Sequence, residues 1–328
     1  MQDDQYIYRF ISFYELYQLY KKKKLRLSLL AVQEDKNEGM GAVLQLANPQ
    51  WASFLSNPER IAGLHLQALH NTYITCWSTE PESVAMWALY SPNKDGIRIR
   101  STVARLKATL AAYQEATSLW KHINHIVGGA ELLTWHWELA NVNYVNLDDF
   151  LDEINNAYAE FGALCTKSAE DNLEWWTAKK GYLMEAQIFT ERFGKTFTMD
   201  HFLKDSSFSH EKELRGVVHA GIRNELDYEE WKRLNDPLRQ LFKSAGPGVL
   251  PSYAYAPVAD DFIDEVCFDP RMPEYKKQVM KDALSPFDIK LAVSRCFGYL
   301  LSEKFSFDPI EGIKRNRLGQ DRNGITDG

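Results

Sequence analysis

The amino-acid sequence predicts an α+β fold with a mixed sheet. Four segments have the alternating or β-branched and aromatic pattern of strands: residues 6–10, 71–78, 96–101 and 213–222. The spacing of apolar residues predicts helices at 11–29 and 81–90, and a mainly helical pattern runs from 102 to about 195. Hydrophobic residues make up 45% of the chain and charged residues 25%, as in ordinary globular proteins. We therefore expect one α+β core with a helical insertion.

The domain organisation follows from these patterns. The 328 residues suffice for a large core, and we expect a single domain over 1–312 with the insertion at about 102–195. Within that insertion, Gly128-Gly129 breaks the helical pattern and residues 141–147 resemble a strand. The polar, glycine-containing tail at 313–328 predicts disorder.

Later segments follow the same alternation of elements. Gly246-Pro247-Gly248 predicts a loop, and residues 266–284 predict a strand, a turn and a helix.

The charge balance argues against a polyanion as the default partner. The 45 acidic and 38 basic residues give a net charge of −7, which repels nucleic acid unless a local basic patch exists. Lys21–Lys24 form such a run, but lysines also interact favourably with a helix C-terminus, and this interpretation is favoured.

The cysteines and the apolar pattern indicate a cytoplasmic protein. Cys76, Cys165, Cys267 and Cys296 are widely separated and form no CxxC pair, which suits a reducing compartment. No apolar run reaches the roughly 20 residues of a membrane span, and the first ten residues lack the pattern of a signal peptide. We expect no membrane contact.

Common catalytic motifs are missing from the sequence. His65 and His70, His122 and His125, and the isolated His136 have no matching ligand at metal-binding spacing, so packing or surface roles are favoured and no metal is expected. The sequence contains no GxGxxG, GxxxxGK[ST] or GxSxG motif, so no motif indicates a Rossmann, P-loop or hydrolase-elbow site.

Three short blocks of polar residues remain as candidate chemistry. Tyr8-Arg9-Phe10 lies on the first strand, Cys76-Trp77-Ser78-Thr79 ends the second, and Glu211-Lys212-Glu213-Leu214-Arg215 opens a late strand. Residues two apart in a strand point to the same face, so Glu211 and Glu213 are expected to present adjacent carboxylates. Their repulsion should raise one pKa, so that one group handles protons and the other stabilises positive charge.

Such a set of residues would suit the cleavage of NAD. Breaking the nicotinamide–ribose bond creates an oxocarbenium-like centre that a carboxylate stabilises. Arg9 would bind the pyrophosphate, and Ser78 would orient the carboxylate and the ribose. An aromatic ring of Trp77, Trp87 or Tyr90 would stack on the nicotinamide.

Each block also has a structural interpretation. Arg9 can pair with a surface carboxylate, Ser78-Thr79 can cap the following helix, and Glu-x-Glu-x-Arg can be a solvated salt-bridged strand face. The order of the three blocks is what favours a shared site.

The blocks resemble those of a widespread bacterial family of unknown function. Its members share a Tyr-Arg start, a Cys-(Phe/Trp)-Ser, Met-Trp-x-x-Tyr and Gly block, and a Glu-x-Glu-x-Arg block; the similarity spans about residues 6–285 and is most specific at Met86–Tyr90 and Glu211–Arg215.

The order of the blocks is also similar to the Arg–Ser–Glu pattern of arginine-modifying ADP-ribosyltransferases. That resemblance implies a fold of this type and an NAD site made by Arg9, Ser78 and the two glutamates. Tyr8 and Thr79, which stand beside Arg9 and Ser78 in the same blocks, are also expected to bind the cofactor. The chain departs from the pattern at Glu80, where a serine is expected, and in its long insertion.

The resemblance implies an NAD-dependent ADP-ribosyltransferase, a toxin-like or phage-defence effector that modifies a host macromolecule and is restrained by an antitoxin-like protein. Glu213 would hold the ribose and Glu211 would position or deprotonate the acceptor, for which the net charge favours protein over RNA or DNA. Two alternatives stay open: an NAD glycohydrolase using the same pocket, and a non-catalytic protein-interaction module.

Overall fold

A computed structural model describes residues 1–33, 69–117, 132–150, 152, 156, 201–223, 242–243 and 250–298. Most of the expected insertion beyond residue 150, the Gly128-Gly129 and Gly246–Gly248 segments and the expected disordered tail at 313–328 lie outside these residues. The domain boundaries therefore stay a prediction.

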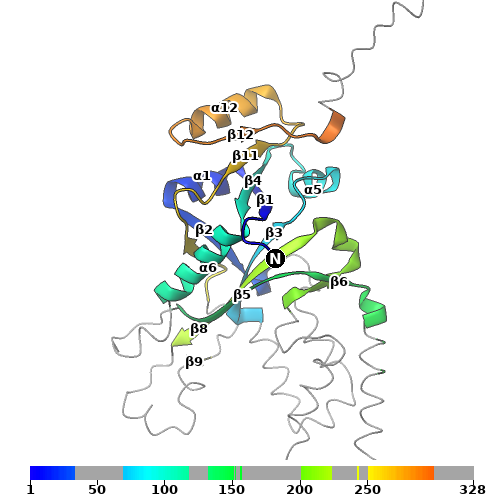
Figure 1. The fold of residues 1–328 in the computed structure, drawn as a ribbon, viewed down its shortest axis with the longest axis vertical. Coiled ribbons are helices and arrows are strands. Elements are labelled where there is room, and N and C mark those ends of the chain that lie inside the picture. Colours follow the sequence, from blue (N-terminus) through cyan, green and yellow to red (C-terminus); the bar gives the residue numbers. More distant parts are fainter. Residues whose placement is uncertain are drawn as a thin grey trace, which may run out of the picture.

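Among the described residues, ten strands form one mixed sheet (Figure 1). Its main path runs β10 (Tyr253–Pro257), β2 (Lys24–Leu29), β3 (Thr72–Ser78), β1 (Tyr6–Ser12), β4 (Gly96–Thr102), β11 (Glu265–Phe268) and β12 (Leu291–Ala292). Strand β8 (Glu213–Arg223) pairs with β3, β5 (Leu132–Asn141) and β9 (Phe242–Lys243). The α+β class with a mixed sheet is confirmed.

Strand β3 is the branch point of this sheet. Along one edge it pairs with β8 from Thr72 to Ser78. Along the other edge it pairs with β2 at Tyr73 and Ile74 and with β1 at Ser78. The register therefore leaves Thr75–Trp77 between the ends of two different neighbours, and the sheet forks there.

The first helix is shorter than the sequence predicts. Helix α1 (Phe13–Lys22) begins after the Ser12 N-cap, whose hydroxyl accepts from the Glu15 backbone N–H. It ends at Lys22, and the C-cap residue Lys23 adopts a left-handed conformation with φ 53°. Two of the lysines lie in the last helical turn, as expected from the helix dipole.

Residues 24–29 form strand β2 instead of continuing that helix. Their leucines, Leu25, Leu27 and Leu29, alternate with polar residues and are buried. A period of two buries one face of a strand, whereas it would spread these leucines around a helix. The prediction of a helix over 11–29 was wrong for this part.

The segment expected to be a helical insertion contributes to the sheet. Helix α6 (Val103–Thr117) has the predicted helical structure, but residues 132–141 form strand β5, which pairs antiparallel with β8 from Leu132↔Ile222 to Asn141↔Leu214. Long-range pairing with a buried strand outweighed the helical pattern. The short β6 (Asn143–Val145) falls inside the predicted strand at 141–147 and pairs in parallel with β7 (Leu203–Asp205).

The remaining described elements follow the sequence predictions. Strands β1, β3, β4 and β8 and helix α5 (Val84–Tyr90) lie within one to three residues of the expected bounds, and β11 with helix α12 (Glu274–Leu284) forms the expected strand, turn and helix. Figure 1 shows α12 above the β11–β12 end of the sheet. Among all the residues that the structure describes, no helix is long and apolar enough to cross a membrane.

Candidate functional site

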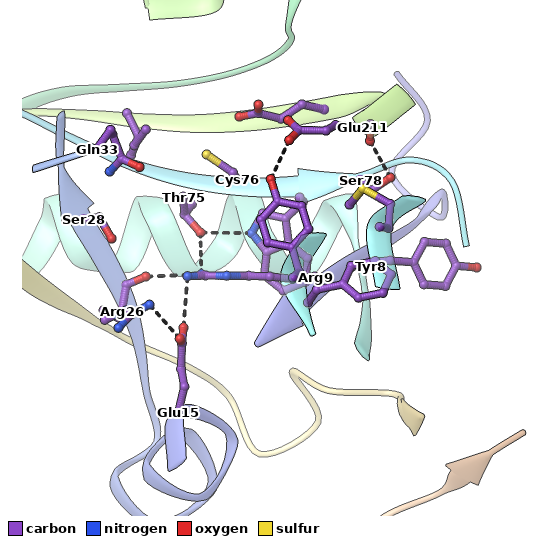
Figure 2. Close-up of a pocket in the computed structure, with 16 residues that line it drawn as sticks. Tyr8, Arg9, Glu15, Arg26, Ser28, Gln33, Thr75, Cys76, Ser78 and Glu211 are labelled. Carbon is purple, nitrogen blue, oxygen red and sulfur yellow. Dashed lines mark hydrogen bonds and ion pairs between the residues drawn. The ribbon is translucent and has the colours of Figure 1, made fainter. Parts of the chain in front are cut away.

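A pocket of about 240 Å³ opens where the sheet forks. Strands β1, β2 and β3, helices α1 and α5, and the segment before β8 contribute its walls (Figure 2). Seven of the nine predicted site residues line it: Tyr8, Arg9, Trp77, Ser78, Tyr90, Glu211 and Glu213. The structure thus brings together the three sequence blocks, although they come from distant parts of the chain.

Arg9 crosses the gap between β1 and β2 at one end of the pocket. Its Nη1 donates to Thr75 Oγ1 at 2.9 Å and to the Arg26 carbonyl at 3.3 Å. Its Nη2 pairs with Glu15 Oε1 at 3.0 Å, and Arg26 Nη2 pairs with Glu15 Oε2 at 2.7 Å (Figure 2). Two guanidinium groups share one carboxylate, so this end carries one net positive charge.

The two predicted glutamates meet at the other end, around a lysine. Lys204 Nζ lies 2.7 Å from Glu211 Oε2 and 3.4 Å from Glu213 Oε2. All three side chains are buried. The lysine lets two carboxylates stand next to each other without leaving their repulsion uncompensated.

The carboxylates do not converge in the predicted way. Glu211 is the last residue of a 3₁₀ helix, η3 (Ser206–Glu211), and β8 begins only at Glu213. Lys212 between them adopts a left-handed conformation with φ 45° and is exposed. A tight turn, not the two-residue repeat of a strand, therefore places both glutamates at the pocket.

Arg215 binds the Glu213 carboxylate inside the protein. Its Nε lies 2.7 Å from Oε1 and its Nη2 3.1 Å from Oε2, while Nη1 donates to the His201 carbonyl at 2.8 Å. Arg215 is 0% exposed and Glu213 4%. The predicted alternative of a solvated salt-bridged face was wrong, because this ion pair lies inside the protein.

The charges around Glu213 decide its protonation. Burial opposes the ionised form, but the charge and hydrogen bonds of Arg215, the charge of Lys204 and a hydrogen bond from Cys76 outweigh it. They lower the pKa of Glu213 from 4.5 to about 2. Glu213 is therefore a fixed negative charge at neutral pH, which fits the expected role of the carboxylate that stabilises positive charge.

Ser78 and Thr79 fix the backbone that carries the glutamates. Ser78 Oγ donates to the Glu211 carbonyl at 2.7 Å, and both the N–H and the hydroxyl of Thr79 donate to the Lys212 carbonyl at 3.0 Å. Thr79 does not line the pocket. Helix α5 is capped by Ser83, whose hydroxyl accepts from Met86 N–H at 3.1 Å, so the cap interpretation of Ser78-Thr79 was wrong.

Tyr90 offers an accessible aromatic ring at the acidic end. Its hydroxyl donates to Glu211 Oε1 at 2.5 Å, and its ring stacks on Phe10 with centroids 6.2 Å apart. Burial of the hydroxyl and the charge of the nearby Glu211 raise the pKa of Tyr90, so the phenol stays protonated. The tyrosine can thus hold the carboxylate and present a ring face.

The two tryptophans lie deeper than predicted. Trp77 contributes to the pocket wall, but it is only 2% exposed and donates from Nε1 to Thr75 Oγ1 at 3.1 Å. Trp87 is 0% exposed, does not line the pocket and donates to Glu82 Oε2 at 3.0 Å. Trp87 therefore presents no ring face for a nicotinamide in this structure.

Sequence reasoning missed several side chains that shape the pocket. Glu15, Arg26 and Thr75 surround Arg9, and Lys204 joins the two glutamates. The spacing of Thr75 and Trp77 on one face of β3 was an available signal for Thr75. The sequence around Lys204 does not identify it as a site residue, because the pairing of β6 with β7 places it beside the glutamates. Within the described residues, no group of three or more His, Cys, Asp and Glu side chains could hold a metal ion.

Comparison with known proteins gives a partial family match. A family model described as a protein of unknown function, DUF2971, matches residues 86–216. This range contains the Met86–Tyr90 and Glu211–Arg215 blocks but neither Arg9 nor Ser78. It agrees with the expected resemblance to a family of unknown function over that part of the chain.

Curated proteins and solved structures add little to this match. No curated protein matches the chain. Among solved structures, DarT from Thermus sp. 2.9 in complex with NAD⁺ is similar with a TM-score of 0.29 and 10% sequence identity, covering 90% of this chain and 97% of that chain. A superposition at this score does not establish a common fold.

Proposed function

We propose that this protein is an NAD-dependent ADP-ribosyltransferase that acts at the pocket in the forked sheet. One observation carries the proposal: a single pocket has Arg9 and Arg26 at one end and the carboxylates of Glu211 and Glu213 at the other. NAD needs both, because its pyrophosphate is anionic and its nicotinamide ribose becomes cationic as the glycosidic bond breaks.

In the proposed reaction, the bond between ribose C1′ and the nicotinamide nitrogen breaks, and its electron pair leaves with neutral nicotinamide. The acceptor nucleophile forms the new bond to C1′ and gives up one proton. The ionised Glu213 stabilises the positive charge that develops at the ribose, since its pKa of about 2 keeps it charged at neutral pH.

Glu211 is the proposed base for the acceptor. It holds both Tyr90 and Lys204, which orient its carboxylate towards the pocket. The lost proton passes to Glu211 and then to solvent. Tyr90 offers its ring to the nicotinamide, because it is 45% exposed while the tryptophans are buried.

The proposed acceptor is a protein. A net charge of −7 disfavours approach of RNA or DNA, although Lys21–Lys24 could gather a polyanion locally. A toxin-like or phage-defence role in the cytoplasm, with an inhibitory partner protein, belongs to the same proposal.

The direct test is a pair of conservative variants assayed with labelled NAD and a cell lysate. Glu213→Gln keeps the shape of the side chain but removes its charge, so we expect kcat for nicotinamide release to fall by about 10²–10³-fold with less change in NAD binding. Glu211→Gln should suppress label transfer to protein while slow NAD hydrolysis continues, because water needs less positioning than an acceptor.

A control is needed because Glu213→Gln removes the countercharge of the fully buried Arg215, which can destabilise the fold. Glu265→Gln breaks a comparable buried ion pair, in which Arg98 Nη2 lies 3.1 Å from Glu265 Oε1. Neither residue lines the pocket. The Glu265→Gln variant should lose stability and keep turnover, with thermal unfolding measured for all three variants.

The same assay separates the alternatives. Nicotinamide release without label transfer would make the protein an NAD glycohydrolase, and label that is lost with nuclease treatment would make the acceptor a nucleic acid. If the native protein neither releases nicotinamide nor transfers label, the enzyme proposal fails and the interaction module stands.

A further inference from the structure

A second, larger cavity of about 500 Å³ lies beside the candidate site. Helix α1, strand β2 and strand β10 form its walls, through Tyr14, Lys22, Lys24 and Tyr255 among others. Glu15 and Arg26 line this cavity and also the first pocket. The two cavities therefore share a wall, and that wall is built from charged side chains.

The shared wall carries the positive charge of the site. Arg9 and Arg26 both pair with the same Glu15 carboxylate. The Arg26 side chain is 37% exposed, and its guanidinium also lies over the Tyr253 ring at 5.0 Å. Glu15 is 12% exposed and also pairs with Arg9, so Arg26 can exchange this carboxylate for a phosphate without leaving Glu15 unpaired, while Tyr253 still supports the guanidinium.

We propose that the second cavity binds the adenosine half of NAD, with the pyrophosphate at Arg9 and Arg26 between the two cavities. The inference rests on the proposed function and extends it to the other end of the substrate. A dinucleotide is two nucleosides joined by an anionic bridge. The structure has two adjacent cavities, with Arg26 in both linings and Arg9, which shares the Glu15 carboxylate with Arg26, in the lining of the first.

The side chains of the second cavity suit a purine nucleoside. Tyr14 is 80% exposed and Tyr255 51%, so both offer ring faces on which a base can stack. Lys22 and Lys24 bring two further cations to the cavity, which attract the phosphates and are solvated when the ligand is absent. The opposite orientation would place the nicotinamide ribose far from both glutamates and leave it without a stabilising carboxylate.

The experiment compares two substrates that differ only at the adenosine end. Nicotinamide mononucleotide carries the scissile bond and one phosphate but lacks the adenylate, so the second cavity can improve only NAD. The measured quantity is the ratio of kcat/KM for NAD to kcat/KM for the mononucleotide. In Tyr14→Ala and Tyr255→Ala this ratio should fall about tenfold each, the value of one base–aromatic stack.

Tyr275→Ala is the matched control, because Tyr275 is an exposed tyrosine on α12 outside both cavities. It should keep the native ratio. If Tyr14→Ala and Tyr255→Ala also keep the native ratio, the inference is wrong even though NAD is cleaved.

A binding measurement keeps this result separate from the proposed function. If the native protein cleaves neither substrate, titration with adenosine monophosphate by calorimetry decides the second cavity alone. Binding that Tyr14→Ala weakens about tenfold, and Tyr275→Ala does not, would support the nucleoside cavity without the enzyme. No binding, or equal binding by all three proteins, would overturn it.

Discussion

At the scale of residues, the acidic end of the pocket is a balanced cluster of four buried charges. Glu211 and Glu213 are offset by Lys204 and Arg215, and each cation lies within hydrogen-bonding distance of a carboxylate. Buried charges are tolerated when they are paired in this way, and removing one partner leaves another uncompensated. The cluster can thus fix two carboxylates at one place, which an unpaired couple could not do at neutral pH.

The first prediction at this scale concerns Lys204. Replacing it by methionine, Lys204→Met, keeps much of the volume and removes the positive charge between the glutamates, so at least one carboxyl pKa rises. The acid limb of the pH profile for nicotinamide release should move to higher pH by about one unit or more. Lys204→Arg keeps the charge and should restore the native limb. A Lys204→Met enzyme with lower turnover at every pH but an unmoved limb would assign this lysine a purely structural role.

The sequence anticipated some of these residues and not others. Arg9, Ser78 and Glu213 could be found because each lies in a short block of polar and aromatic residues on a predicted strand. Lys204 could not, since its place depends on the pairing of β7 with β6 and on the left-handed turn at Lys212. The pKa of Glu213 was likewise beyond reach, because the motif suggests a solvated salt bridge with Arg215, and the burial of that contact follows only from the fold.

At the scale of elements, local pattern and long-range pairing disagree in two places. The helix predicted over 11–29 stops at Lys22 because the leucines of β2 bury one face of a strand. Residues 132–141 are strand β5 because β8 supplies an antiparallel partner along this segment, with a register shift between Thr134 and His136. Both misassigned segments are strands of the sheet, where hydrogen bonding to a neighbouring strand overrides local propensity. Strands β1, β3, β4 and β8 were predictable because their own patterns already fit a pleated surface.

The prediction at this scale concerns the close packing of β8 under the pocket. A Cβ placed on Gly216 would lie 2.9 Å from Thr75 Cγ2 and 3.0 Å from Leu110 Cδ1. Gly216→Ala should therefore lower the free energy of unfolding by about 1–3 kcal/mol, because the side chains of Thr75 and Leu110 must shift away from β8.

The same substitution tests the coupling of packing to the site. Displacing Thr75 disturbs the hydroxyl that accepts from Arg9, so KM for NAD should rise in the folded variant. Chemical denaturation and steady-state kinetics measure the two effects. Native stability in Gly216→Ala would contradict close packing between β8, Thr75 and Leu110.

At the scale of the whole molecule, the partly buried His219 and the buried Glu213 make stability depend on pH in two overlapping ranges. Burial and the neighbouring His136 lower the pKa of His219 from 6.5 to about 4, and Arg215 and Lys204 hold the pKa of Glu213 at about 2 despite its burial. Both folded pKa values lie below the unfolded values, so the unfolded chain binds more protons and stability falls as the pH falls.

We expect the loss from His219 as the pH falls from 6.5 to about 4, and the loss from Glu213 as it falls from 4.5 to about 2. For Glu213 the difference corresponds to about 3 kcal/mol that is fully present above its unfolded pKa. Urea unfolding measured across this range should show both slopes. His219→Gln should flatten only the upper one, and an unchanged slope in that variant would contradict the assignment.

The pairing of β3 with β8 also has a consequence for how the protein is made. The hydrogen bond between Ser78 and the Glu211 carbonyl closes a loop of 133 residues, and contacts of such separation form late because loop-closure entropy must be overcome first. On the ribosome, β1, α1 and β2 emerge long before β8, the strand that pairs with the other edge of β3. The acidic wall is added only after residue 213 has left the exit tunnel. A nascent chain thus carries its arginines early and its carboxylates late, so it stays without a complete pocket through most of its synthesis.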